Sequence, residues 1–376
     1  MERSFISYSE GTNTDVNLKV VIEDIKKQGE NTDPILIVYA SDVENFKIYS
    51  EKLHEAFPNS TVIGESSMVM YCSEGTVSHK GLETLTIMSG IEVQGGAILD
   101  ITTRPEKHAP EIQECLSKLT STSNTICLEF CTAFVNSEEL ILDTFKSVLK
   151  NTDIELCGSS AGKEYNFSDF INLIAFDGKV YDEACVYVFI RNMNGRIGLF
   201  KENMYRPTEH KFTVTDADVD ERIVYELDNR PAAEVFRQTL KIGPEAYEEN
   251  LLFHPFGRLI GDEVFITQGL SVNEDDSMTF FAKLYNRTNV AILELEDIKN
   301  TWSKTSDRIR KEGYKPSFSI VINCSARTLI FERMNILNEY SDTLSDYYGK
   351  YIGLSGFGEQ LKFEHLNQTM VIAIFE

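Results

Sequence analysis

The chain has 376 residues and a formal net charge of −23, because 59 acidic residues outnumber 36 basic ones. A surface this acidic repels phosphate backbones and anionic lipid headgroups, so it argues against nucleic acid or a membrane surface as the partner. Hydrophobic residues make up 42% of the chain, and no run approaches the roughly 20 apolar residues of a membrane span. Length and composition predict a globular protein with two domains.

Up to residue 190, apolar runs bounded by turn residues indicate strands, and apolar residues spaced three and four apart indicate helices. Helices are predicted at 16–25, 46–57, 110–119 and 140–148. Strands are predicted at 34–40, 61–63, 82–88, 91–101, 125–130, 154–157, 170–176 and 184–190.

The next segment, 191–222, is polar and rich in turn residues, and Asn194-Gly195 predicts a hairpin turn within it. We therefore expect the domain boundary at its end, with an N-terminal domain of residues 1–222 and a C-terminal domain of residues 223–376. In the second domain, helices are predicted at 232–240, 298–311 and 330–348. Strands are predicted there at 223–227, 251–257, 264–267, 278–285, 289–295, 318–323 and 369–375.

One layout occurs three times along the chain. A strand ends in a small polar pair, at Ala40-Ser41, Cys131-Thr132 and Cys324-Ser325, and a helical segment follows each pair. A Gly-x-Ser sequence then begins 23, 26 and 28 residues after the second residue of each pair, at Gly64, Gly158 and Gly353. The repeat predicts an α/β fold of β-α-β-β units whose mixed sheets are flanked by helices. The sheets form either single layers or an αββα sandwich.

The repeat also predicts where polar groups gather. In α/β units, the carboxyl ends of the strands and the N-termini of the helices lie on one rim, where free N–H groups favour an anion or carboxylate. Serine and threonine hydroxyls can both donate and accept hydrogen bonds there. Arg327 follows the third strand, where its guanidinium could hold a ligand carboxylate or form an ion pair with Glu359.

Catalysis is the alternative interpretation. Residues 158–162 match the Gly-x-Ser-x-Gly nucleophile elbow, but that motif requires a helix directly after it, and the sequence predicts a strand. Cys324 is a second candidate nucleophile, although the six histidines have no spacing that supplies a partner base. A hydrolase or transferase using Ser160 or Cys324 thus remains one alternative, and a structural interaction module without a ligand is another.

Cofactors and oxidising compartments are both disfavoured by the motifs. The sequence contains no metal-ligand spacing, phosphate-binding loop or dinucleotide-binding glycine pattern, so we expect no cofactor. Seven cysteines without a Cys-x-x-Cys pair are typical of reduced thiols, and residues 1–5 lack the apolar segment of a signal peptide. Together these features predict a cytoplasmic protein.

Five segments carry a family resemblance: 62–67 (VIGESS), 156–162 (LCGSSAG), 225–232 (YELDNRPA), 324–327 (CSAR) and 356–359 (GFGE). Their order and spacing resemble those of the FIST family of bacterial signalling modules, with a FIST N-terminal module to about residue 222 and a C-terminal module after it. The resemblance implies an intracellular sensory domain that binds a small ligand, with amino acids or small carboxylates as the expected class.

The resemblance also implies a separate output protein, such as a chemoreceptor, a histidine kinase or another signalling protein, because the two modules occupy the whole chain. A non-enzymatic cytosolic sensor is therefore the leading hypothesis. The repeat and the resemblance together point to nine candidate ligand-binding residues: Ser66, Ser67, Ser159, Ser160, Cys324, Ser325, Arg327, Ser355 and Glu359.

Overall fold

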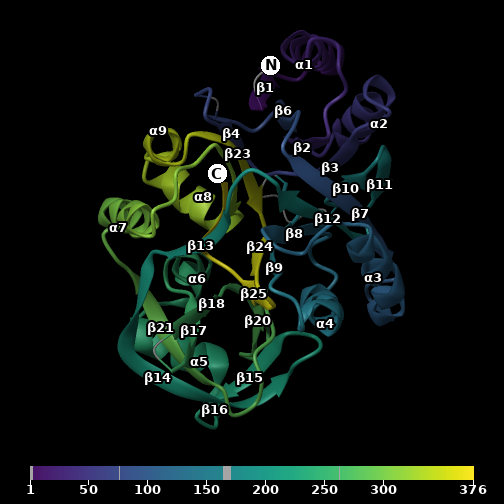
Figure 1. Ribbon diagram of the computed structural model, residues 1–376. Coiled ribbons are helices and arrows are strands. Elements are labelled where there is room, and N and C mark those ends of the chain that lie inside the picture. The colour runs from purple at the N-terminus through teal and green to yellow at the C-terminus, as the bar shows by residue number, and fades with distance from the viewer. Residues whose placement is uncertain (1–2, 76, 164–170, 262) are drawn as a thin grey trace.

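The structure, a computed structural model, describes residues 3–75, 77–163, 171–261 and 263–376. It confirms the predicted mixed α/β architecture and the repeated unit (Figure 1). Over the described residues, strands form three six-stranded sheets of identical topology and one larger sheet. Three sheets, rather than the two of an αββα sandwich, face one common core.

The first sheet contains the first Gly-x-Ser sequence. Its strands in spatial order are β1 (Ser4–Glu10), β6 (Gly81–Ile87), β2 (Leu36–Ser41), β3 (Thr61–Ser66), β10 (Ile174–Phe176) and β11 (Lys179–Tyr181). Strands β2 and β3 are parallel, and the other pairs are antiparallel. The helices α1 (Thr14–Gln28) and α2 (Phe46–Ala56) supply the connections, as the apolar periodicity predicts.

The second and third sheets repeat this order. The second runs β7 (Ile91–Leu99), β12 (Ala184–Asn192), β8 (Thr125–Cys131), β9 (Glu155–Ser160), β24 (Gly358–Leu361) and β25 (Glu364–Leu366). The third runs β13 (Ile197–Asn203), β26 (Thr369–Phe375), β22 (Phe318–Cys324), β23 (Lys350–Gly356), β4 (Met70–Cys72) and β5 (Val77–Ser78). Their helices are α3 (Ala109–Ser117), α4 (Glu138–Leu149), α7 (Ile298–Lys311), α8 (Ser325–Arg333) and α9 (Leu337–Tyr348), and a 3₁₀ turn, Pro105–His108, precedes α3.

Each repeat lends a hairpin to another repeat. The hairpin β4–β5 of the first repeat completes the third sheet, β10–β11 of the second completes the first, and β24–β25 of the third completes the second. The exchange closes into a ring, so no repeat has a complete sheet without its neighbours. We call this assembly the three-repeat body.

The inner faces of the three sheets form a continuous apolar core. Val38 of the first repeat, Leu128 of the second and Ile320 of the third all belong to it and are fully buried. The outer faces are covered by the helices of each repeat, and α1, α2, α3, α7 and α9 lie at the periphery of the molecule in Figure 1. Burying both faces explains why the central strands are continuous apolar runs rather than alternating ones.

The third repeat carries an insertion between β13 and α7, which we call the inserted lobe (residues 205–295). Its sheet runs β18 (Glu263–Thr267), β17 (Phe256–Ile260), β21 (Asn289–Leu295), β14 (Tyr205–Asp218), β15 (Ile223–Leu227), β20 (Met278–Phe280) and β19 (Gly269–Val272), with β16 (Arg230–Pro231) paired to β15. The helices α5 (Ala232–Leu240) and α6 (Tyr247–Phe253) and a 3₁₀ turn, Pro244–Ala246, pack against it. It forms the lower part of the molecule in Figure 1.

Several local predictions were wrong for physical reasons. The polar segment 191–222 contains β13, in which half-buried and buried side chains alternate, and the long strand β14, in which half of the side chains are exposed. Neither strand is a continuous apolar run, so the sequence lacks an apolar strand signal. The apolar run 251–257, expected to be one strand, contains the end of α6 and the start of β17. A short apolar run does not distinguish a helix from a strand. Asn194-Gly195 joins strands of different sheets rather than a hairpin, because β13 pairs with β26.

Residue 170 of the strand expected at 170–176 lies outside the described residues, and β10 occupies the last three positions of that range. The single helix expected at 330–348 is divided into two helices, α8 and α9. The expected domain boundary at 222/223 falls between β14 and β15, which are paired in one sheet. The strand register also revises the alignment of the repeats, because Ser41, Cys131 and Asn323 are the residues paired with the three shared serines.

Candidate functional site

The three Gly-x-Ser turns meet at the junction of the repeats. Each serine carbonyl accepts a hydrogen bond from a backbone N–H of another repeat: Met68 donates to Ser355 (2.9 Å), Gly162 to Ser66 (2.7 Å) and Phe357 to Ser160 (2.8 Å). The three bonds form a closed cycle that follows the hairpin exchange. The three turns therefore converge in the fold.

The shared glycines are required by close approach. A Cβ on Gly64 would overlap the ring of Tyr39, and one on Gly353 would overlap the ring of Tyr71. At the second repeat, a Cβ on Gly158 would collide with the backbone of Glu129. Gly64 and Gly158 thus serve packing within their own repeats, and Gly353 serves packing against the hairpin of the first repeat.

The serine hydroxyls at this junction are engaged inside the protein. Ser66 Oγ donates to the Gly162 carbonyl (2.7 Å), and Ser67 Oγ donates to the Val69 carbonyl (2.8 Å). Ser355 Oγ lies 2.9 Å from the Thr328 hydroxyl, and all these serines are buried. Their predicted role in ligand binding stays a prediction, and the contacts that the structure shows are structural.

Arg327 is fully buried and bonded to the protein. Its guanidinium donates to the Glu202 carboxylate on β13 (2.6 Å) and to the Glu202 carbonyl (3.1 Å). The expected partner Glu359 accepts instead from the backbone N–H of Thr369 (3.1 Å), and burial raises its pKa well above the ordinary value. Arg327 therefore anchors α8 to β13.

Ser160 and Cys131 lie in a second buried polar cluster. The Ser160 hydroxyl accepts from Gln360 Nε2 (3.0 Å) and lies 3.4 Å from both Cys131 Sγ and the Glu138 carboxylate. His365 contacts Gln360 (3.2 Å) rather than Ser160, and burial lowers its pKa. No hydrogen bond between Ser160 and a histidine is present in the described part of the chain, and strand β9 ends at Ser160 without an immediate helix.

Burial also raises the pKa of the cysteine thiols that face these clusters, namely Cys131 and Cys324. A thiol with a raised pKa is less ionised at neutral pH, which disfavours nucleophilic attack. Among the described residues, the geometry around Ser160 and Cys324 thus supplies neither an activated hydroxyl nor an activated thiol.

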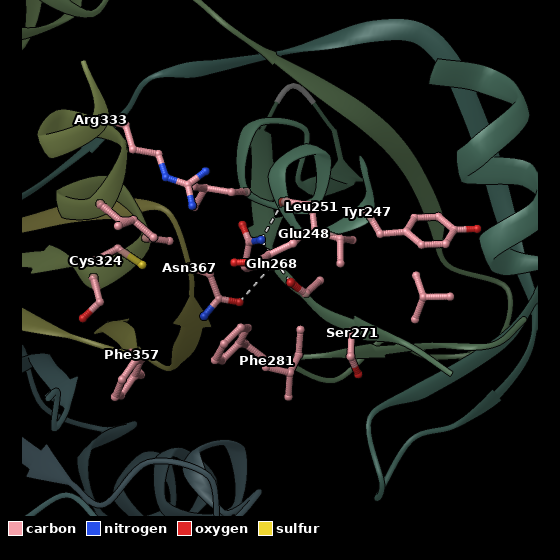
Figure 2. A pocket seen from close by; sticks show the side chains of 17 residues that line it. Tyr247, Glu248, Leu251, Gln268, Ser271, Phe281, Cys324, Arg333, Phe357 and Asn367 are labelled. Atoms are coloured by element: carbon pink, nitrogen blue, oxygen red, sulfur yellow. Dashed lines mark hydrogen bonds between the residues drawn. The ribbon is translucent and has the colours of Figure 1, made fainter. Parts of the chain in front are cut away.

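A cavity of about 240 Å³ lies between the inserted lobe and the third repeat (Figure 2). The inserted lobe contributes residues from α6, β19 and the segment after β20; the third repeat contributes the end of β22, helix α8 and residues near β24 and β25. The lining residues are Tyr247, Glu248, Leu251, Leu252, Gln268, Gly269, Leu270, Ser271, Val272, Phe281, Cys324, Ser325, Ala326, Leu329, Arg333, Phe357 and Asn367. Two of the nine predicted residues, Cys324 and Ser325, are among them.

Three amides join the two sides of this cavity. Gln268 Nε2 donates to the Leu251 carbonyl of α6 (2.6 Å), and Gln368 Nε2 donates to the Leu252 carbonyl (2.8 Å) and to Gln268 Oε1 (2.8 Å). Asn367 Oδ1 accepts from the Gln268 backbone N–H (3.1 Å), a bond drawn in Figure 2. These bonds satisfy the last carbonyls of α6 and fix its position against the three-repeat body.

Two polar side chains of the lining retain unused hydrogen-bonding capacity. Ser325 Oγ and Asn367 Nδ2 have no hydrogen-bond partner among the described residues, although each side chain is about 1% exposed. Buried polar groups are normally paired, although unpaired ones also occur elsewhere in the described residues, as at Ser306 and Trp302. The two in this lining make the cavity a candidate site for a bound molecule.

Most of the lining could not be predicted from the sequence. Residues of the inserted lobe, such as Gln268 and Ser271, carry no motif, and they reach α8 only because the lobe folds back onto the third repeat. Asn367 follows the short strand β25, and no regular spacing of polar residues in the sequence points to it. The signal that did identify part of the site is the polar pair Cys324-Ser325 at the end of a buried strand.

None of the helices in the described ranges has the length and apolar character needed to cross a bilayer. In the same ranges, histidine, cysteine, aspartate and glutamate side chains do not cluster in groups of three or more that could hold a metal ion.

Two family models together match most of the chain. Residues 35–230 match the model of the FIST N domain, and residues 232–362 match the model of the FIST C domain. A search of curated proteins found no match.

Proposed function

Because the chain belongs to the FIST family, whose domains are associated with sensory functions in signal transduction, we propose that it is a sensor that binds a small polar metabolite. The binding site is the cavity between the inserted lobe and the third repeat. An amino acid or a small carboxylate is the ligand class, and the signal passes to a separate partner such as a chemoreceptor or a histidine kinase.

The observation that carries this proposal is the cavity with unpaired polar groups in its lining. Ser325 and Asn367 come from the three-repeat body, whereas Tyr247, Gln268 and Ser271 come from the inserted lobe. A ligand that contacts both sides changes the free energy of their relative placement, which is the requirement for a conformational signal. The amide bonds between the two sides are the contacts that such a shift would remodel.

A binding role is favoured over catalysis by the surroundings of the candidate nucleophiles. The Ser160 hydroxyl has no histidine partner in the described residues, and Cys324 is a buried thiol whose pKa is raised. We place the protein in the cytoplasm, because all seven cysteines are free thiols and six of them are buried.

A thermal-shift screen of amino acids and small carboxylates tests the proposal. A ligand that binds only the native state at 100 times its Kd stabilises the protein by about 2.7 kcal/mol. The variant Ser271→Phe, which fills the cavity, should abolish the shift, whereas Ser345→Phe, at a half-buried serine on α9, should preserve it. Absence of a shift with every compound at millimolar concentration, or an equal shift in both variants, would contradict the proposal.

A further inference from the structure

The cavity lining divides into an apolar wall and a polar end. Leu251, Leu270, Val272, Phe281 and Leu329 supply aliphatic and aromatic surface from both sides of the cavity. Such a wall favours a ligand with an apolar body, because burying apolar surface is the main source of affinity in small cavities. A fully polar ligand would lose its hydration there without compensation.

The polar end lies at the start of α8. This helix begins at Ser325, and Cys324 precedes it without a side-chain hydrogen bond that caps the helix. Its first turn contains no acidic residue. The partial positive charge of the helix N-terminus is therefore not offset by a carboxylate of α8 itself.

Two side chains reinforce this end. The Ser325 hydroxyl and the Asn367 amide nitrogen are buried and have no partner in the described residues. The Asn367 oxygen is held by the Gln268 N–H, so the amide cannot rotate to reverse its donor and acceptor without losing that bond. Figure 2 shows the Asn367 nitrogen on the side opposite to the dashed bond. The unpaired groups at this end are thus hydrogen-bond donors or can act as donors.

We infer that the ligand is a small carboxylate with an apolar body, bound with its carboxylate at the first turn of α8 beside Ser325 and Asn367. The inference rests on the proposed function, since it names the ligand class of the same cavity. The apolar body lies against the leucine, valine and phenylalanine side chains. Glu359, whose carboxyl group interacts with Cys324, is buried, and burial raises its pKa, which disfavours the charged form that would repel the ligand.

Charged side chains at the exposed rim of the cavity do not determine the class of ligand. Arg333 and Glu248 are exposed and of opposite charge, so together they neither attract nor repel a net charge strongly. The inferred ligand therefore needs a carboxylate and an apolar body, and it does not need an amino group. Apolar amino acids and the corresponding acids without the amino group should both bind.

Isothermal titration with matched probes tests the ligand class. The probes are 3-phenylpropionate, 4-methylpentanoate, phenylalanine, 3-phenylpropan-1-ol, 2-phenylethylamine, glutamate and lysine. The two acids and phenylalanine should bind at least about 10-fold more tightly than the alcohol and the amine, because a hydrogen bond to a charged group typically contributes that much or more. Binding of the alcohol or amine as tightly as the acid would overturn the inference.

The same titrations distinguish this inference from the proposed function. Binding of glutamate or lysine alone, lost in Ser271→Phe, would overturn the apolar carboxylate and leave the sensor cavity standing. Failure of all the probes here would overturn the ligand class named above. Failure of the wider metabolite screen as well would also overturn the sensor function.

The variant Ser325→Ala tests the position of the carboxylate. It removes a hydroxyl without a partner in the free protein, so the melting temperature should be unchanged or slightly higher, while 3-phenylpropionate binding should weaken about 10-fold. Ser306→Ala is the matched control, because Ser306 carries another buried unpaired hydroxyl, on α7 and outside the cavity. An unchanged affinity in Ser325→Ala, with a large loss in Arg333→Gln, would place the carboxylate at the rim and overturn the inferred orientation.

Discussion

Replacing Glu129 by glutamine should change how the stability of the protein depends on pH. Glu129 lies on β8 and is completely buried; its Oε1 has no hydrogen-bond partner among the described residues, and its Oε2 accepts from Cys185 Sγ at 3.3 Å. Burial raises the pKa of Glu129 to about 8 from an ordinary value of 4.5. Glutamine has the shape of the protonated carboxyl group and cannot ionise.

The sign of the effect follows from proton linkage. The folded protein holds the Glu129 proton more tightly than the unfolded chain, so ionisation costs stability as the pH rises above 4.5, and the loss is complete near pH 8. The difference between the two pKa values corresponds to about 5 kcal/mol, or about 1.4 kcal/mol per pH unit within this window. The buried carboxyl groups of Glu65, Glu83 and Glu359, whose pKa values are also raised, add to the same trend.

Urea unfolding at pH values from 5 to 8.5 measures this dependence. The free energies of unfolding of wild type and Glu129→Gln should be similar near pH 5, and the variant should be several kcal/mol more stable at pH 8. Glu114→Gln, a change at an exposed carboxylate, serves as the control and should follow the wild-type curve. Parallel curves for wild type and Glu129→Gln would refute the reasoning that this carboxyl group is buried and protonated.

Three further predictions concern a buried ion pair, a glycine at the repeat junction and a buried thiol. Arg327→Met should destabilise the protein by about 3–5 kcal/mol in urea unfolding, because it leaves the buried Glu202 carboxylate unpaired. Adding Glu202→Met should restore most of the lost stability, whereas additive losses in the double variant would argue against an ion pair between the two residues. Gly162→Ala should lower the free energy of unfolding by about 1–3 kcal/mol, since its Cβ would overlap the Ser355 carbonyl; an unchanged transition would mean that the junction can relax. Iodoacetamide should label Cys324 slowly in the native protein and readily in urea, and rapid native labelling would favour the cysteine-enzyme alternative.

The repeated architecture could be predicted because local signals coincide with it. Continuous apolar strands such as 34–40 and 318–323 and the glycines at 64, 158 and 353 are visible as short local patterns in the sequence. The strands pack into a core that the three repeats share, and Gly353 contacts Tyr71 of the first repeat. The ring of exchanged hairpins could not be predicted, because pairings such as β9 with β24 join residues about 200 positions apart and leave no local pattern.

The candidate site could be predicted only in part for the same reason. Cys324 and Ser325 stand out as polar residues at the end of a buried strand, and they do line the cavity. Arg327 looks like a ligand-binding residue in the sequence, but its partner Glu202 lies in a polar segment that gives no strand signal. The remaining lining belongs to the inserted lobe, whose position against α8 is a property of the complete fold.

The most direct measurement of the central claim is a crystal structure of the protein with the compound that gives the largest thermal shift. Electron density for that compound should lie between Gln268 of the inserted lobe and Ser325 of α8, in contact with both. Density for the compound at any other surface, with this cavity empty, would show that the cavity is not the binding site.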